Sequence, residues 1–308
     1  MEPLVASSTA VLVCQGRASA DGRYAVGRFD DPVARHLLDP PELEVVEEVR
    51  GDRPWSVGPR DVSRELVRWT GVGMVPRTIA IDDAIREHGA TQVVILGAGL
   101  DSRAWRMDEL AAATVFEVDH PASSHDKKRR LSGRPPTAGR VVAVEVDLAR
   151  DPLAPPLTAS GFSPATPTTW VWEGVVPYLA ARAVRHTVAH IGALSATGSR
   201  LVISYQARSW RTAMLRKLMR VVFRVARQGD PLAGEPWRSW WTPQSMRRLL
   251  APHGFEVERD DDLLTLSAGL DLPAGRESSL RNGRIVVATR QPDRPARRDA
   301  ESPHPTSV

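Results

Sequence analysis

Short apolar segments alternate with amphipathic ones through most of this 308-residue chain, and this alternation constrains the fold more than any other feature. Seven segments have the length and the β-branched and aromatic content of strands: 91–99, 113–120, 140–148, 168–174, 199–206, 254–260 and 283–290. Helical patterns lie between most of them, at 103–111, 122–131, 180–195 and 243–252. Strands that alternate with helices are typical of a parallel sheet covered on both faces. We therefore predict an α/β protein with a seven-stranded sheet.

The same pattern divides the chain into parts. Residues 1–90 read as a helical segment that precedes the core of the sheet at 91–206. Residues 207–242 interrupt the sheet, and an insertion of this length in a compact α/β domain usually serves as a lid or substrate cap. Residues 243–290 complete the sheet. The Pro-rich polar segment 291–308 has almost nothing to bury and is expected to be a disordered tail.

Composition argues against several classes of protein. No run of 18 apolar residues exists, so we expect no membrane span, and the N-terminus lacks the basic region of a signal peptide. Cys14 is the only cysteine, which excludes a disulfide within the chain and favours a cytoplasmic location. All but three of the 41 basic residues are arginines, scattered among 37 acids with no module that reads nucleic acid. We expect no nucleic-acid partner and no metal site.

The segment VVILGAGLDSRAWRM (93–107) joins the first predicted strand to a helix through a glycine turn. In open parallel sheets, ligands bind outside the carboxyl ends of the strands. Gly97 and Gly99 lie at such an end, where glycine lets the backbone approach a ligand closely. A nicotinamide-dinucleotide fingerprint requires a third glycine where this chain has Ser102. The turn, which continues into Asp101, therefore argues against a dinucleotide.

Acidic residues end the next three predicted strands. Asp119 ends the second strand, where a carboxylate can accept hydrogen bonds from both ribose hydroxyls of an adenosine. Asp147 and Leu148 end the third strand, placed for the exocyclic amine and the ring face of adenine. Glu173 ends the fourth strand at the same edge of the sheet.

Three acids without a phosphate-loop lysine suit a ligand that bears positive charge and no phosphate. S-adenosylmethionine has this chemistry, with an adenosine, a sulfonium and an amino acid end. Arg77, upstream of the first strand, is placed to pair with the methionine carboxylate as a fork of donors. The glycine turn would then hold the amino acid half of the cofactor.

These segments resemble successive blocks of the leucine carboxyl methyltransferase-like family of class I methyltransferases. The resemblance covers about residues 7–206 and rests on SSTAVLVCQGRA, RFDDPVARHLL, RTIAIDDAI, the glycine turn, FEVDHPASSHDKKRRL, EVDL and WVWEGVVPYLAARAVRHTVAHIGALSATGSRLVISY. The family includes eukaryotic phosphatase carboxyl methyltransferases and bacterial polyketide carboxyl O-methyltransferases of the tetracenomycin type. It implies a Rossmann-like, seven-stranded fold with a helical N-terminal segment and a helical lid, S-adenosylmethionine as cofactor, and methyl transfer to oxygen.

The resemblance also implies roles for single residues. The resemblance implies that Arg77 binds the carboxylate of the cofactor and that Gly97 belongs to the glycine turn that contacts it. It further implies that Asp119 binds the ribose, Asp147 with Leu148 the adenine, and Glu173 the methionine amine. Two positions depart from the family pattern. Ser102 replaces the usual threonine of the turn and keeps its hydroxyl, and SSTAVLVC lacks the lysine that reaches the cofactor in the eukaryotic enzymes. The second departure favours the bacterial small-molecule branch.

The reaction would be an in-line attack of an oxygen on the sulfonium methyl group. A carboxylate is already ionised at neutral pH and needs no general base, whereas a phenol or an alcohol would need one. Candidates for that base are Tyr178, Tyr205 and the histidines His120, His186 and His253.

Aromatic and basic residues near the insertion are candidates for binding the acceptor. Trp237 and Trp241 would line an apolar pocket for a polyketide-like molecule, or would only pack the insertion onto the core. Arg208 and Arg211 would hold a carboxylate, or would be solvated surface charges. Three alternatives stay open beside a small-molecule O-methyltransferase of secondary metabolism: a protein C-terminal carboxyl methyltransferase, a nicotinamide-dependent oxidoreductase and a cofactor-binding protein without catalysis.

Overall fold

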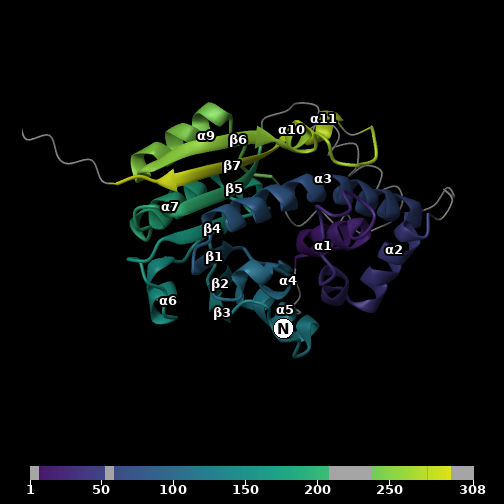
Figure 1. Ribbon diagram of the computed structural model, residues 1–308, viewed down its shortest axis with the longest axis horizontal. Coiled ribbons are helices and arrows are strands. Elements are labelled where there is room, and N and C mark those ends of the chain that lie inside the picture. The colour runs from purple at the N-terminus through teal and green to yellow at the C-terminus, as the bar shows by residue number, and fades with distance from the viewer. Residues whose placement is uncertain (1–6, 53–58, 208–236, 276, 293–308) are drawn as a thin grey trace, which may run out of the picture.

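The computed structural model describes residues 7–52, 59–207, 237–275 and 277–292, which fold around one central sheet (Figure 1). All seven predicted strands form: β1 (Gln92–Leu96), β2 (Thr114–Asp119), β3 (Arg140–Glu145), β4 (Thr168–Trp172), β5 (Arg200–Gln206), β6 (Phe255–Asp262) and β7 (Gly283–Arg290). They lie in the order β3-β2-β1-β4-β5-β7-β6. The strand order reverses between β1 and β4, so the carboxyl ends of these strands border the crevice where ligands bind in such sheets.

One strand departs from the parallel arrangement that the alternation of strands and helices indicates. The strands β1 to β5 pair in parallel, but β7 is antiparallel to both of its neighbours, β5 and β6. The connection from β6 to β7 carries the two short helices α10 (Leu263–Leu266) and α11 (Glu277–Leu280). It starts and ends at the same end of the sheet, since Asp262 pairs with Arg284, and it therefore joins two antiparallel neighbours.

Helices cover both faces of the sheet, as the alternating pattern predicts. One face packs against α6 (Ala154–Ala159), α7 (Ala181–Ala193) and α9 (Pro243–Leu250) through a core that includes Phe116 and Trp170. The opposite face packs against α3 (Pro59–His88), α4 (Arg103–Arg106), α10 and α11 through a core that includes Val93 and Val115. Every residue of β1 is buried, because its side chains alternate between these two cores.

The remaining described helices are α1 (Ser8–Ala20), η1 (Ala34–Leu37), α2 (Pro40–Arg50), η2 (Asp108–Leu110), α5 (Pro121–Leu131), η3 (Val176–Tyr178) and η4 (Ala251–His253). The helices α1, α2 and α3 pack together beside the sheet (Figure 1). Helices α1 and α3 approach closely at two glycines, since a Cβ on Gly16 would lie 2.9 Å from the amide nitrogen of Gly71. This close crossing brings the N-terminal end of α1 to the carboxyl ends of the strands, where Ser7, Thr9 and Ala10 line a cavity.

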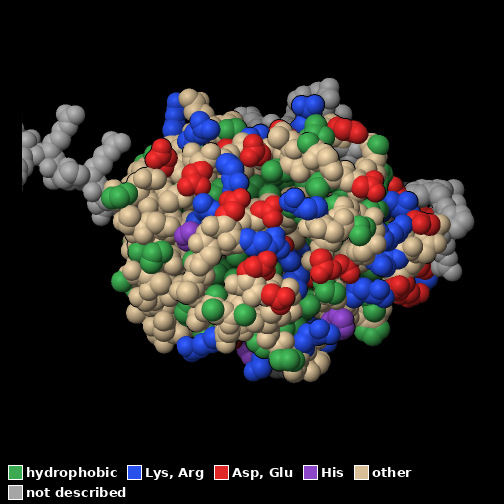
Figure 2. Space-filling model, viewed as in Figure 1, with side chains coloured by type: hydrophobic (Ala, Val, Ile, Leu, Met, Phe, Trp, Pro, Cys, Tyr) green, Lys and Arg blue, Asp and Glu red, His purple; other side chains and the backbone are tan. Residues whose placement is uncertain are grey.

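Several predicted segments cannot be compared with the structure. The expected lid at 207–242 falls mainly on 208–236, and the expected tail falls mainly on 293–308, and both stretches lie outside the described residues. Among the helices that are described, none is long and apolar enough to cross a membrane. On the face shown in Figure 2, basic and acidic side chains are interspersed rather than gathered into one basic patch.

Candidate active site

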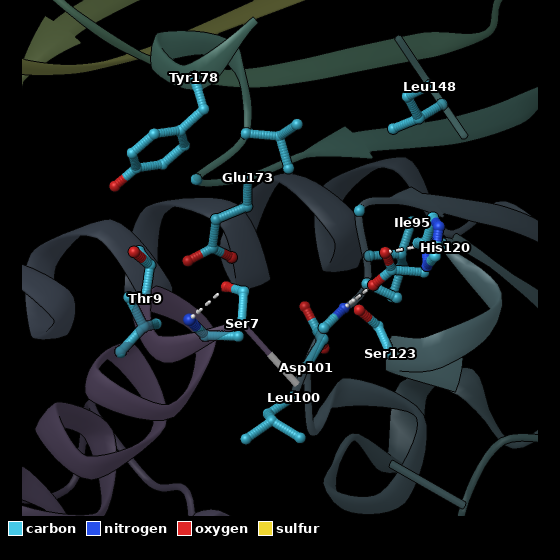
Figure 3. Close-up of a pocket in the computed structure, with 18 of the residues that line it drawn as sticks. Ser7, Thr9, Ile95, Leu100, Asp101, His120, Ser123, Leu148, Glu173 and Tyr178 are labelled. Atoms are coloured by element: carbon cyan, nitrogen blue, oxygen red, sulfur yellow. Dashed lines mark hydrogen bonds between the residues drawn. The ribbon is translucent and has the colours of Figure 1, made fainter. Parts of the chain in front are cut away.

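The carboxyl ends of β1, β2, β3 and β4 open onto a cavity of about 330 Å³, which we call the main cavity. All eight residues predicted to bind the cofactor line it, together with His120: Arg77, Gly97, Gly99, Asp101, Asp119, Asp147, Leu148 and Glu173. The N-terminal end of α1 closes the cavity from the other side. Figure 3 places Leu148, His120 and Ser123 at one end of the main cavity and Thr9 and Tyr178 at the other.

The glycine turn after β1 owes its shape to two residues with positive φ. Gly97 has φ +66° and Gly99 has φ +46°, in the left-handed region that favours glycine. A Cβ on Gly97 would also lie 2.3 Å from Cγ2 of Val175, in the segment that follows β4. The Gly97 amide donates to the Val118 carbonyl, 2.7 Å away, which fixes the turn against β2. Both glycines are therefore required by the backbone before any ligand is considered.

Asp119 is held at the end of β2 by backbone donors. Its Oδ2 accepts from the Gly99 amide and its Oδ1 accepts from the His120 amide, 2.7 Å away. Burial raises the pKa of Asp119 above its ordinary value, although these two amides act in the opposite direction. Each carboxylate oxygen has two acceptor positions, so both oxygens can still accept from a hydroxyl. The pair of acceptors fits the two adjacent hydroxyls of a ribose.

Glu173, at the end of β4, lies within a buried network of ion pairs. Its Oε1 is 2.7 Å from Nε of Arg77, and its Oε2 accepts from Arg103 at 2.7 Å. Burial opposes ionisation of Glu173, but the charges of Arg103, Arg77 and Arg17 outweigh it and hold its pKa far below the ordinary value. The Arg77 and Glu173 atoms of this pair make no aligned hydrogen bond, although both are buried. Both side chains also line the main cavity, where a polar ligand can engage them.

The network extends well beyond the predicted site. Its members are Arg17, Arg77, Arg103 and Arg106 with Asp31, Asp82, Asp101 and Glu173, four formal positive and four formal negative charges. Arg103 is central, because it contacts Asp82, Asp101 and Glu173 at once and is only 2% exposed. Ser102 donates to Asp31 at 2.7 Å. The serine in place of a third glycine is therefore a buried member of this network.

Sequence reasoning missed Arg17 and Arg103 as residues of the site. Arg17 lines the main cavity from α1, one turn beyond the stretch in which a lysine is absent. Its Nε lies 2.8 Å from Asp31 and it donates to the Leu100 carbonyl at 2.6 Å. Arg103 lies two residues after Asp101 in the glycine-turn segment, so the sequence places it near the site. Its partners Asp82 and Glu173 could not be predicted, because Asp82 lies on α3 and Glu173 follows β4.

Asp147 and Leu148 form the part of the main cavity that follows β3. Oδ1 of Asp147 accepts from the Ala149 amide at 2.9 Å, and this local turn fixes the carboxylate at the cavity wall. Leu148 packs against the core on the side of α6 and α7 and presents an apolar surface to the cavity. Together they offer an acceptor beside an apolar face, which fits the edge and the face of an adenine ring.

A second, smaller cavity of about 80 Å³ adjoins the main cavity, and we call it the side cavity. The residues that line both cavities are Thr9, Val13, Arg77, Gly174 and Tyr178. Met74, Pro177, Leu263 and Trp237 give the side cavity a largely apolar wall. The five shared residues therefore mark the junction through which a group held in one cavity can reach the other.

The two candidate tyrosines differ in their surroundings. The Tyr205 hydroxyl donates to the Asp260 carboxylate at 2.8 Å, and it accepts from Nε of Arg284 at 3.1 Å. Burial and the hydrogen bond to Asp260 raise the pKa of Tyr205 well above its ordinary value, so this phenol is not suited to act as a base. Tyr178 stands at the junction, and its hydroxyl makes no hydrogen bond to any described residue.

The remaining candidates separate clearly. Trp237 lines the side cavity, whereas Trp241 is 7% exposed and packs into the core, the second of the two roles that the sequence left open. Arg208 and Arg211 lie outside the described residues. His186 and His253 line neither cavity. Within the described ranges, no cluster of three or more His, Cys, Asp or Glu side chains is placed to hold a metal ion.

Comparisons with known proteins agree with this arrangement. The model of the family described as leucine carboxyl methyltransferase matches residues 10–192. A relative in Mycobacteroides abscessus that bears the name of an S-adenosyl-L-methionine-dependent methyltransferase is 43% identical over 231 residues, or 71% of this chain and 73% of that protein. A relative of the same name in Mycobacterium marinum is 33% identical over 287 residues, 85% of this chain and 92% of that protein.

Solved structures share the fold at low sequence identity. A DUF574 family protein of Streptomyces avermitilis aligns with a TM-score of 0.57 and 14% identity, over 93% of this chain and 98% of its own. A methyltransferase of Thermobifida fusca aligns with a TM-score of 0.52 and 17% identity, over 94% and 97%.

Proposed function

Because this chain belongs to the leucine carboxyl methyltransferase family, it is an S-adenosylmethionine-dependent methyltransferase, and we propose that it methylates a carboxylate or hydroxyl oxygen of a small molecule. The observation that carries this proposal is the pair of adjoining cavities, one larger and bordered by the acidic strand ends, the other small and free of acidic side chains among its described lining residues. The first suits the cofactor and the second suits the end of an acceptor. A single buried cysteine, Cys14, fits a cytoplasmic enzyme.

The residues of the main cavity fit the parts of the cofactor in order. Asp119 would accept from the ribose hydroxyls, and Asp147 with Leu148 would hold the adenine. Glu173 and Arg77 would divide the amino acid end between them, the carboxylate of Glu173 taking the ammonium and the guanidinium of Arg77 taking the carboxylate. When bound, the cofactor supplies a methyl group on a positively charged sulfur. The protein supplies position and a dry environment for the attack.

The side cavity would hold the acceptor with its oxygen at the junction. A carboxylate acceptor arrives ionised, so no residue need remove a proton. Hydrogen bonds hold the Tyr205 hydroxyl to Asp260 and Arg284, so Tyr205 would only form part of the wall of the side cavity. We assign Tyr178 the role of touching the acceptor, because its hydroxyl is at the junction and makes no hydrogen bond to any described residue.

The structure also bears on the dinucleotide alternative. Helix N-termini bind phosphates in dinucleotide sites, but α4, which follows the glycine turn, has only four residues. Asp101, in the turn itself, would face the diphosphate with negative charge instead. A nicotinamide cofactor is therefore disfavoured. A protein carboxyl terminus and a small carboxylic acid present the same carboxylate to the methyl group. An experiment must therefore decide which of the two is the acceptor.

Replacing Arg77 by lysine is expected to weaken the affinity for S-adenosylhomocysteine about tenfold. Lysine keeps the charge, but it offers a point donor where the guanidinium offers a planar fork to a carboxylate. Isothermal titration calorimetry measures the change. The control is Arg86→Lys on the same helix, whose side chain is 41% exposed and lies outside both cavities. Equal affinities of wild type and Arg77→Lys would remove Arg77 from the carboxylate site.

Methyl transfer itself can be measured with cofactor labelled in the methyl group. The panel should contain benzoic acid, a polyketide-like aromatic acid, 2-naphthol and a short peptide ending in leucine. We expect label in a small acid or phenol, and methanol released by alkali identifies an ester as opposed to an ether. Label in the peptide alone would instead support a protein carboxyl methyltransferase. Tight cofactor binding without transfer to any of these acceptors would contradict the proposed oxygen acceptor.

A further inference from the structure

Thr9 carries a buried hydroxyl that has no hydrogen-bond partner among the described residues. Leaving a buried hydroxyl unpaired is destabilising, so such an atom in a folded protein calls for an explanation. Three residues with buried, unbonded side-chain atoms line the main cavity: Thr9, Arg77 and Glu173. The Arg77 and Glu173 atoms form an ion pair with each other. The Thr9 hydroxyl has no such partner.

The position of Thr9 is fixed by the start of α1. Ser7 caps the helix, and its hydroxyl oxygen accepts from the Ala10 amide at 3.1 Å. Thr9 follows in the first turn, at the positive end of a 13-residue helix. It lines both the main cavity and the side cavity, so it stands at the junction. In Figure 3 its hydroxyl and that of Tyr178 face the same space, opposite the end where Leu148 and His120 lie.

We propose that Thr9 is a further acceptor-binding residue, whose hydroxyl donates a hydrogen bond to the oxygen-bearing group of the methyl acceptor. The group is at the junction between the two cavities, where the acceptor oxygen must lie, and the positive end of α1 favours a partly negative oxygen there. Thr9 keeps its proton throughout and only orients the acceptor. This inference rests on the proposed function, since it requires a cofactor in the main cavity and an acceptor in the side cavity.

The test uses cofactor analogues that reach the junction without an identified acceptor. In one analogue an ethyl group replaces the sulfonium methyl group, and in the other a carboxymethyl group replaces it. Calorimetry gives the dissociation constants of both analogues and of S-adenosylhomocysteine for the full chain and for Thr9→Val, an isosteric change that removes the hydroxyl. The ratio of the two analogue constants isolates the interaction of Thr9 with the added oxygens.

We expect Thr9→Val to reduce the preference for the carboxymethyl analogue about tenfold, while the affinity for S-adenosylhomocysteine changes less than about twofold. Thr9→Ser should keep the preference, because it keeps the hydroxyl. The matched control is Thr78→Val, since Thr78 also has a buried, unbonded hydroxyl but lines neither cavity. This control should behave as wild type.

Two results would overturn the role of Thr9. An unchanged preference in Thr9→Val would show that the hydroxyl does not meet the acceptor group. An equal loss of affinity for S-adenosylhomocysteine and for both analogues would assign Thr9 to the cofactor. A wild type that fails to bind S-adenosylhomocysteine would instead refute the proposed function, and the inference with it.

Discussion

Replacing Asp119 by alanine is expected to weaken the binding of S-adenosylhomocysteine about 30- to 150-fold. The carboxylate would provide two charge-assisted hydrogen bonds to the ribose, together worth about 2–3 kcal/mol. Both of its oxygens also accept from backbone amides, so the carboxylate is held in place before the cofactor arrives. Calorimetric titration of purified wild type and variant measures the change directly.

Two controls separate the ribose contact from damage to the glycine turn. Asp119→Asn keeps one oxygen acceptor for the Gly99 amide or the ribose and should lose less affinity than alanine. Asp108→Ala removes an exposed carboxylate at the other end of the sheet and should leave the affinity unchanged. If Asp119→Ala binds as well as wild type, the ribose lies elsewhere and the assignment is wrong.

Replacing Arg103 by methionine is expected to lower the free energy of unfolding by about 3–5 kcal/mol. The arginine lies between Asp82, Asp101 and Glu173, and removing it leaves three buried carboxylates with too little positive charge. Urea denaturation followed by the fluorescence of the nine tryptophans measures the loss. Because the arginines hold the pKa of Glu173 below its ordinary 4.5, this stabilisation is present above that pH and is lost as the pH falls below it.

The matched control for Arg103 is an ion pair at the surface. Arg259 contacts Glu87 at 2.6 Å, and both side chains are nearly half exposed, 45% and 46%. Arg259→Met should therefore cost less than about 1 kcal/mol. If the two variants lose the same small amount of stability at neutral pH, the buried network does not hold α1, α3 and α4 to the strand ends.

The sequence predicted the strands well because the apolar residues of each strand, and the residues that end it, are contiguous in the chain. Apolar runs such as TQVVILGAG mark both the strand and its glycine end, and the acids at Asp119, Asp147 and Glu173 follow the strand ends directly. These residues meet at one edge because parallel strands share that edge. The direction of β7 was not predictable in this way, because the apolar pattern of a strand is the same in either direction.

Hydrogen-bond and ion-pair partners that are distant in the sequence could not be predicted from local patterns either. The sequence predicts Tyr205 as a candidate base, but β6 places Asp260, 55 residues later, 2.8 Å from its hydroxyl, and this contact makes Tyr205 unsuited to that role. Arg103 and Glu173 are 70 residues apart and meet only when the sheet assembles. The sequence does not indicate a binding role for the hydroxyl of Thr9, because that role depends on the two cavities that Thr9 borders.

We propose that the main cavity binds S-adenosylmethionine. The most direct test is calorimetric titration of the purified chain with S-adenosylmethionine, S-adenosylhomocysteine and NADH in parallel. We expect micromolar binding of the first two and none of the third. Binding of NADH alone would contradict it, because the glycine turn and the acids at the strand ends would then serve a dinucleotide.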